Sequence, residues 1–168
     1  MPEHFDDDAT DAIVLAKAEA RIFGHRHVAP EHLLLALTDN PDTAAARILE
    51  RLGTSAAAIQ ADVRAVVADG TPGQDPVQHL TPRAKLVVDI AVRFARRLDT
   101  ATTGTEHLLY GVAAEREGLA ARVLRAHGVM RGPIEHLIAG VIHDALRAAE
   151  PNAEFPGTAV PAGADPTG

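Results

Sequence analysis

Apolar residues recur along most of this chain at the three- and four-residue spacing that places them on one face of an α-helix. The clearest stretches carry this spacing at Ile13, Ala16, Ala20 and Phe23, and again at Val88, Ala91, Ala95 and Leu98. Hydrophobic residues, many of them Ala, make up 46% of the chain, whereas aromatic residues make up only 3%. Because strands favour β-branched and aromatic residues, this pattern predicts closely packed helices and an all-α fold.

These two stretches belong to an internal repeat with a period of 75 residues. Shifting the sequence by this amount produces twelve identities over positions 13–53 without a gap. They include the dipeptides Glu31-His32 and Glu106-His107. Apolar periodicity alone would match a few Leu and Ala residues, but it would not match a Glu-His pair, an Arg and a Gly at one offset. The sequence therefore indicates a tandem duplication.

Each half of the duplication is predicted to form four helices, giving two pseudo-symmetric four-helix repeats in one domain. We expect this domain to span residues 1–149, with repeat one at about 5–67, a turn-rich linker at about 68–80 and repeat two at about 81–149. Residues 150–168 are rich in Pro and Gly and are predicted to be disordered. Their removal is therefore expected to leave stability unchanged.

Residues that favour helix starts and helix ends support these boundaries. Start signals are found at Pro30, Ser55, Thr81, Pro82, Thr105 and Pro133. Glycines that suit a left-handed residue after the third helix are found at Gly53 and Gly128. The two halves therefore share both their apolar spacing and their punctuation.

Composition excludes several classes of protein. The net charge of −7 over 168 residues repels phosphate backbones and anionic lipid, so neither a nucleic-acid nor a membrane partner is expected. The chain has no Cys, which rules out disulfides and thiolate chemistry. The first residues are acidic where a signal peptide would be basic, and no apolar run is long enough to span a membrane. A cytoplasmic protein is expected.

Motifs of known catalytic chemistry are missing from the sequence. It has neither the Gly-rich phosphate loop of ATPases nor a Gly-x-Ser-x-Gly nucleophile elbow. Its nine His residues include no His-Glu-x-x-His pair, and His25 and His27 would point to different sides of a helix. Exposed or helix-capping His residues are the better interpretation, so neither a metal nor a cofactor is expected. We therefore predict a protein that is not an enzyme.

The duplicated segments carry a family resemblance. The second half contains "GTEHLLYGV", preceded by "LTPRAKLVV" and followed by "GLAARVLRAHGV". This set resembles the N-terminal (Clp repeat) domain of Clp unfoldases, of the ClpC and ClpA type, over about residues 5–147. The resemblance implies a domain that docks adaptor and client proteins for an ATPase ring and its protease. It also implies recognition of arginine-phosphorylated proteins, as in ClpC-type members, and binding of cyclic-peptide antibiotics, as in actinobacterial members.

Two acids are the candidate ligand-binding residues. By their place in the Gly-Thr-Glu-His motif, the resemblance implies that Glu31 and Glu106 face a modified guanidinium group. A carboxylate can accept two parallel guanidinium N–H groups, and a nearby helix N-terminus offers backbone N–H groups to a phosphate. A simpler alternative is that each Glu interacts with the helix dipole, an effect of roughly 0.3–1 kcal/mol that needs no ligand.

The two copies of the motif are not equivalent. Repeat two keeps Gly104, Thr105, Glu106 and His107, all of which are candidate ligand-binding residues. Repeat one keeps the candidates Glu31 and His32, but Ala29-Pro30 replaces Gly-Thr, which removes the flexibility of Gly, a hydroxyl and one backbone donor. If the chain binds an arginine-derived group, Glu106 is therefore expected to contribute more than Glu31.

The sequence leaves more than one function open. One is a stand-alone, non-catalytic binding module of the Clp protease system, which docks adaptors or clients or sequesters a cyclic peptide. Another is the excised N-terminal domain of a full ClpC-type ATPase. A helical DNA-binding regulator is a further alternative, suggested by the basic residues within "RAKLVVDIAVRFARR". The negative net charge argues against it, because phosphate neutralisation supplies most non-specific affinity for DNA.

Overall fold

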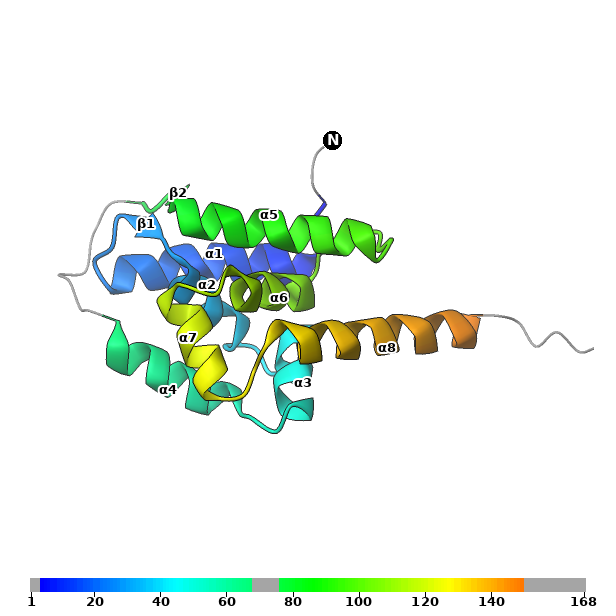
Figure 1. Ribbon diagram of the computed structural model, residues 1–168. Helices are drawn as coiled ribbons and strands as arrows, with labels where there is room; N and C mark the ends of the chain where they lie inside the picture. The colour runs from blue at the N-terminus through cyan, green and yellow to red at the C-terminus, as the bar shows by residue number, and fades with distance from the viewer. Residues whose placement is uncertain (1–3, 68–75, 150–168) are drawn as a thin grey trace, which may run out of the picture.

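The helices of the first half recur 75 residues later in the second half, as the repeat predicts. The computed structural model describes residues 4–67 and 76–149, in which eight helices are found (Figure 1). Repeat one contains α1 (Asp7–Ile22), α2 (Pro30–Leu37), α3 (Ala44–Arg51) and α4 (Ala56–Val66). Repeat two contains α5 (Pro82–Arg97), α6 (Thr105–Glu115), α7 (Leu119–Ala126) and α8 (Arg131–Ala149). The predicted all-α fold of two pseudo-symmetric four-helix repeats is confirmed.

Most of the predicted helix boundaries are also confirmed. Thr81 is the N-cap of α5, where its hydroxyl accepts the Ala84 N–H at 3.2 Å, and Pro82 is the first helical residue. Ser55 caps α4 in the same way. Gly53 and Gly128 have φ values of 79° and 74°, the left-handed conformation that favours Gly after a helix. The last helix, in contrast, begins at Arg131 rather than Pro133, since Pro is tolerated anywhere in a first turn.

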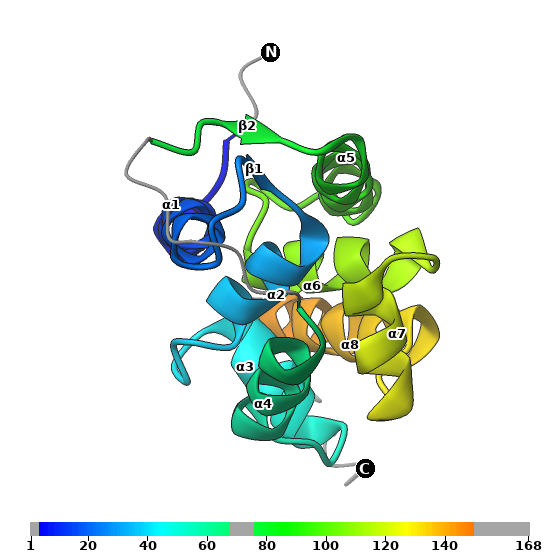
Figure 2. The same cartoon turned by 90° about the vertical axis from the view of Figure 1, so that its left-hand side faces the viewer.

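Two very short strands connect the repeats, and the sequence gave no sign of them. Strand β1 (His27–Val28) pairs in parallel with β2 (His79–Leu80), above the helices in Figure 2. A matching bridge joins Phe5 to Thr103. Phe5 and Thr103 lie 75 residues from Leu80 and Val28, so the bridge is the symmetric counterpart of the β1–β2 pair. The segment before the first helix of each repeat therefore pairs with the other repeat.

The third helices also cross between the repeats. Helix α3 of repeat one packs on α6 of repeat two, while α7 of repeat two packs on α2 and α4 of repeat one. Helices α2 and α6 lie at the centre of the molecule, beneath α1 and α5 (Figures 1 and 2). Their paired leucines are fully buried, at Leu33, Leu34, Leu108 and Leu109. Both repeats thus share one hydrophobic core.

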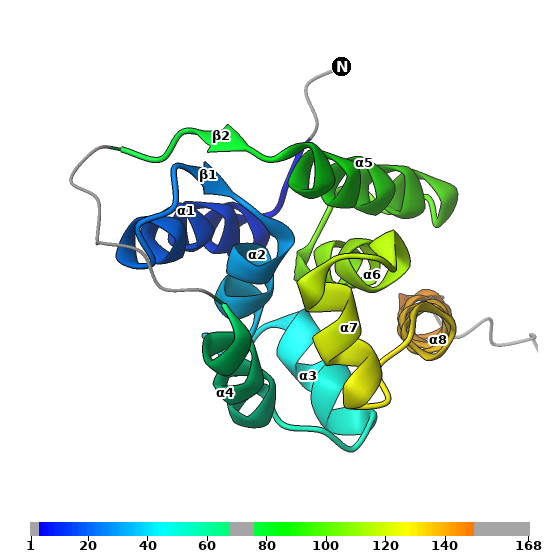
Figure 3. The same ribbon diagram turned by 60° about the vertical axis from the view of Figure 1, so that its left-hand side comes forward.

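The last helix breaks the symmetry. Helix α8 has 19 residues, compared with 11 in its counterpart α4. It packs on α6 and then runs outward from the body of the molecule (Figure 1). Figure 3, in which α8 is viewed along its axis, shows it beside α6 and α7. The boundaries predicted for the domain remain predictions, and both the tail 150–168 and residues 68–75 of the linker lie outside the described residues.

Candidate functional site

A pocket of about 230 Å³ lies between α3 and α8, at the N-terminus of α6. One wall is the α3 stripe of Ala44, Arg47, Ile48 and Arg51. The other is the apolar face of α8, formed by Leu137, Ile138, Val141 and Ile142. Glu106 and Thr100 complete the lining. The pocket thus combines a carboxylate, two guanidinium groups and an apolar wall.

The pocket exists because α8 lies away from α3. On the opposite side of the molecule, the symmetric counterparts α4 and α7 pack directly on each other. A polar chain adds to that contact, with the His127 Nε2 2.7 Å from Asp62 Oδ2 and the His127 Nδ1 3.2 Å from the Thr54 hydroxyl. In repeat two the position of Asp62 is taken by Leu137, which lines the pocket instead. The duplication therefore gives one open groove rather than two equivalent grooves.

Glu106 is the predicted site residue that faces this pocket. It is the second residue of α6, and its side chain is 22% exposed. Burial raises the pKa of its carboxyl group, an effect opposed by the backbone N–H of Glu106 itself. The negative charges of Asp6 and Asp8 raise the pKa further. The start of α1 therefore contributes to the electrostatics of the site.

Gly104 provides the space that these carboxylates occupy. A Cβ atom at this position would lie 2.4 Å from Glu106 Oε2 and 2.7 Å from Asp6 Oδ2, closer than any real contact. The φ value of Gly104 is −98°, so its backbone conformation is available to any residue. The need for Gly is therefore steric: it lets the side chains of Asp6 and Glu106 approach the start of α6 together.

Thr105 is directed away from any ligand. The residue is 1% exposed, and its hydroxyl oxygen accepts the Ala45 N–H at 3.1 Å. Ala45 is the second residue of α3, so this bond joins the N-terminus of α3 to that of α6. In repeat one the same position holds Pro30, which has no hydroxyl. Thr105 thus positions one wall of the pocket.

The two motif histidines cap their helices from inside the core. His107 Nδ1 accepts the Gly104 N–H at 2.9 Å, and His32 Nδ1 accepts the Ala29 N–H at the same distance. Both rings are buried, and burial lowers the pKa of each to about 4. They are therefore neutral at pH 7, with the proton on Nε2. This arrangement is a capping box in which His takes the role usually filled by Glu or Gln.

The two rings differ at their second nitrogen. His32 Nε2 lies 2.9 Å from His25 Nδ1, which accepts its proton. His107 Nε2 has no hydrogen-bond partner among the described residues, although its ring packs edge-on against Phe94. Glu106 Oε1 lies 3.2 Å from His107 Nδ1, but this nitrogen already accepts the Gly104 N–H and carries no proton. The contact is therefore not an ion pair at neutral pH.

The structure thus separates the six predicted site residues into two groups. Glu106 lines the pocket and Gly104 makes room for it, whereas Thr105, His32 and His107 are buried and hold the helix starts in place. Glu31 is half-buried at the corresponding place in repeat one. Sequence reasoning did not single out the remaining lining residues as part of a site. Arg47 gave a signal, because it is one of the repeated identities.

Comparison with known proteins places the chain in a family. The family model of the Clp repeat (R) N-terminal domain matches residues 4–127. The chain belongs to this family. The region of the Clp repeat match contains Glu106 and all of α3, and it ends before α8 begins. One wall of the pocket therefore lies outside the matched residues.

The relatives of this Clp repeat domain are much longer chains. It is 38% identical over 125 residues to the negative regulator of genetic competence ClpC/MecB of Bacillus subtilis, a match that covers 74% of this chain and 15% of the relative. Among solved structures, the Hsp104 N-terminal domain of Candida albicans superposes with a TM-score of 0.67 at 14% identity, covering 83% of this chain and 92% of that one. A complex of the ClpV N-domain with a VipB peptide superposes with a TM-score of 0.63 at 16% identity, covering 83% and 88%.

Two further searches of the Clp repeat domain gave negative results within the part that the structure describes. No helix in residues 4–67 or 76–149 is both long and apolar enough to cross a membrane. Over the same ranges, no three His, Asp or Glu side chains are grouped so that they could hold a metal ion.

Proposed function

We propose that this Clp repeat domain is a non-catalytic docking module, and that an arginine side chain of a client or adaptor protein binds in the pocket between α3 and α8. The observation that carries this proposal is the position of Glu106, a partly buried carboxylate at the end of a groove with an apolar wall. A guanidinium group can lie on that carboxylate and donate two parallel N–H bonds. The carboxylate is the reading group of the site.

The rest of the pocket suits the rest of an arginine side chain. Its three methylene groups pack against apolar surface while the charged head remains at a polar group. Leu137, Ile138 and Val141 offer such a surface on α8. Arg47 and Arg51, both exposed on α3, stand at the rim, where they can meet acidic residues next to the bound arginine. The client segment is therefore basic at its centre and acidic at its flanks.

The comparisons support a role in the Clp system. The chain spans about 15% of the length of the curated relatives it matches, which include Clp ATPase subunits. We infer that it serves Clp protease components in the cytoplasm, either alone or as the N-terminal part of an ATPase. The ClpV N-domain, which has the same fold, was solved with a VipB peptide, so the fold can bind peptides. Phosphoarginine and cyclic peptides remain ligands to be tested.

An NMR titration with a short peptide tests the proposal. The peptide contains one arginine flanked by leucines, and the control peptide carries citrulline, a neutral isostere of arginine. We expect backbone amide signals of residues 104–107 and of α8 to shift with the arginine peptide alone. Glu106→Ala should weaken binding about tenfold or more, because a hydrogen bond to a charged group contributes roughly 1.5–3 kcal/mol.

Glu31→Ala is the matched control. It removes the same carboxylate from the other copy of the motif, where Ala29-Pro30 precedes the Glu. We expect it to weaken binding less than Glu106→Ala does. If the arginine peptide shifts no signal near Glu106, or if Glu106→Ala binds as tightly as the wild type, the pocket is not the docking site.

A further inference from the structure

The charges next to the two motif acids are reversed between the repeats. The strand exchange places the start of α1 against the start of α6, through the Phe5–Thr103 bridge. Likewise, it places the start of α5 near the start of α2, through the Leu80–Val28 pair. Asp6 and Asp8 are therefore the neighbours of Glu106, and the residues 75 positions later, Thr81 and Arg83, occupy the equivalent places beside the motif of Glu31.

Three carboxylates thus converge at the Glu106 end of the pocket. The side chains of Asp6 and Glu106 both reach the point that a Gly104 Cβ would occupy, and Asp8 lines the adjoining hollow with Thr105. No Lys or Arg among the described residues forms an ion pair with any of the three. This end of the pocket therefore carries negative charge that a bound cation would neutralise.

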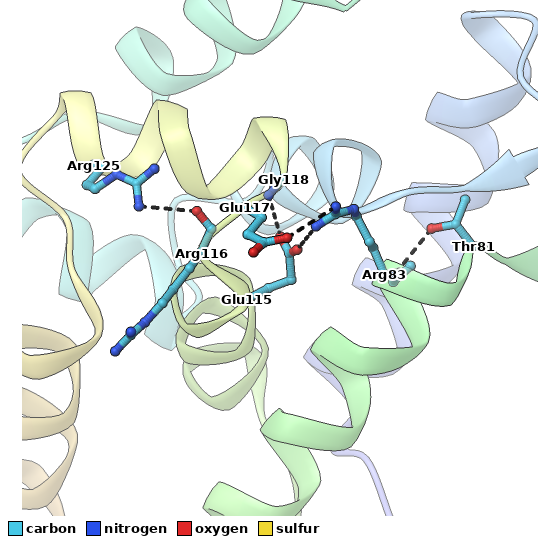
Figure 4. Close-up of polar contacts among 8 residues, drawn as sticks. Thr81, Arg83, Glu115, Arg116, Glu117, Gly118 and Arg125 are labelled. Atoms are coloured by element: carbon cyan, nitrogen blue, oxygen red, sulfur yellow. Dashed lines mark hydrogen bonds and ion pairs between the residues drawn. The ribbon is translucent and has the colours of Figure 1, made fainter.

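The equivalent residues of repeat two carry no such excess. Thr81 is neutral and only caps α5. Arg83 extends toward Glu115 and Glu117 in Figure 4 and forms ion pairs with both. Glu115 in turn accepts the Gly118 N–H at 2.9 Å, at the start of α7. The same two structural positions thus hold two acids in one repeat and a hydroxyl and a cation in the other.

We propose that Asp6 and Asp8 determine the specificity of the Glu106 pocket, which selects an unphosphorylated arginine side chain and rejects phosphoarginine. The inference rests on the proposed function, since it concerns the ligand of the same site. A phosphate group adds about −1.5 to −2 charges. In phosphoarginine it is bonded directly to a guanidinium nitrogen, so it cannot move away from the carboxylate that holds that group.

The hydroxyl and the backbone of the motif do not offset this repulsion. The Thr105 hydroxyl is buried and bonded to the Ala45 N–H, and the Gly104 N–H is bonded to His107. Neither is therefore available to a phosphate. Arg47 and Arg51 are the described cations that line the pocket, and both are exposed on α3 rather than at the start of α6. They leave the acidic end of the pocket uncompensated.

The test compares two peptides of one sequence, one with arginine and the other with phosphoarginine, by isothermal titration calorimetry. We expect the wild type to bind the arginine peptide at least tenfold more tightly. The double variant D6T/D8R copies Thr81 and Arg83 into repeat one, and Thr can keep the α1 cap as Thr81 keeps that of α5. It should narrow this preference at least tenfold or reverse it, and its melting temperature shows whether the fold is retained.

Asp7→Arg is the control for net charge. It changes a charge in the same exposed turn, but Asp7 is not among the groups that act on Glu106. We expect it to leave the preference within about twofold of the wild type, since exposed charges are strongly screened. The preference of the wild type itself should fall as salt is added.

The outcomes separate this inference from the proposed function. If the wild type binds both peptides equally, or prefers phosphoarginine, Asp6 and Asp8 do not set the specificity, although the pocket still docks arginine. If D6T/D8R keeps the preference of the wild type, the inference also fails. If the wild type binds neither peptide, or if Glu106→Gln binds both as the wild type does, the proposed function fails and the inference fails with it.

Discussion

The buried capping histidines should make the domain sensitive to acid. His32 and His107 are neutral in the core, where burial lowers the pKa of each ring from 6.5 to about 4. In the unfolded chain both rings would take up a proton near pH 6.5. The stability that they contribute is therefore fully present above pH 6.5 and is lost as the pH falls toward 4. Within this window the free energy of unfolding should decrease with each proton taken up.

The size of the effect follows from the two pKa values. One pKa unit corresponds to about 1.36 kcal/mol, so each ring accounts for about 3 kcal/mol of stability at pH 7. Two rings together approach the total stability of a typical small domain, which is about 5–15 kcal/mol. Near the middle of the window the free energy of unfolding should fall by about 2.7 kcal/mol per pH unit, because two protons bind on unfolding. Glu106 offsets part of this, since its raised pKa lets it take up a proton in the folded state first.

Urea denaturation followed by circular dichroism, between pH 7 and pH 5, would measure this dependence. The variants His32→Gln and His107→Gln keep an acceptor for the N-cap N–H, as Gln does in a capping box, but they cannot be protonated. Each should remove about half of the slope, and the double variant should leave only the contribution of the carboxylates and exposed histidines. If the double variant keeps the slope of the wild type between pH 6.5 and 5, the buried rings are not its source.

Two further predictions concern packing between the helices. Gly111→Ala should destabilise the domain by about 1–3 kcal/mol, since its Cβ would lie 2.4 Å from the Val87 carbonyl oxygen; Gly140→Ala, which meets open space in α8, should raise the melting temperature. Equal effects of the two in thermal denaturation would contradict this. Thr105→Val should cost about 1–3 kcal/mol by leaving the Ala45 N–H without its acceptor, and a melting temperature equal to that of the wild type would show that the bond contributes nothing.

The fold was largely readable from the sequence because its signals are local. Apolar spacing, the offset of 75 residues and the caps at Ser55 and Thr81 each act within one helix or its ends. The strands were missed because β1 and β2 have only two residues each, too few for any alternation to show. Their pairing depends on segments that are distant in the chain, and no local pattern encodes it.

The site was only partly readable for a related reason. Glu106 could be singled out because the motif repeats, but the pocket around it forms where α8 of one repeat faces α3 of the other. The same limit applies to the motif itself. Thr105 and His107 were proposed as ligand-binding residues from their place in the motif, and their burial became visible only once the helices were packed. Asp6 gave no signal at all, because its neighbour Glu106 lies in the other repeat.

The exchange of segments between the repeats bears on how such a protein is made and how it arose. Because Phe5 pairs with Thr103, most of the domain must leave the ribosome before the first strand segment finds its partner. One half of the chain alone would have its leading segment and its third helix without partners. Two copies of that half could supply these partners to each other. The duplicated chain is thus a covalently joined version of a symmetric dimer, and fusion of two such genes is the simplest history for it.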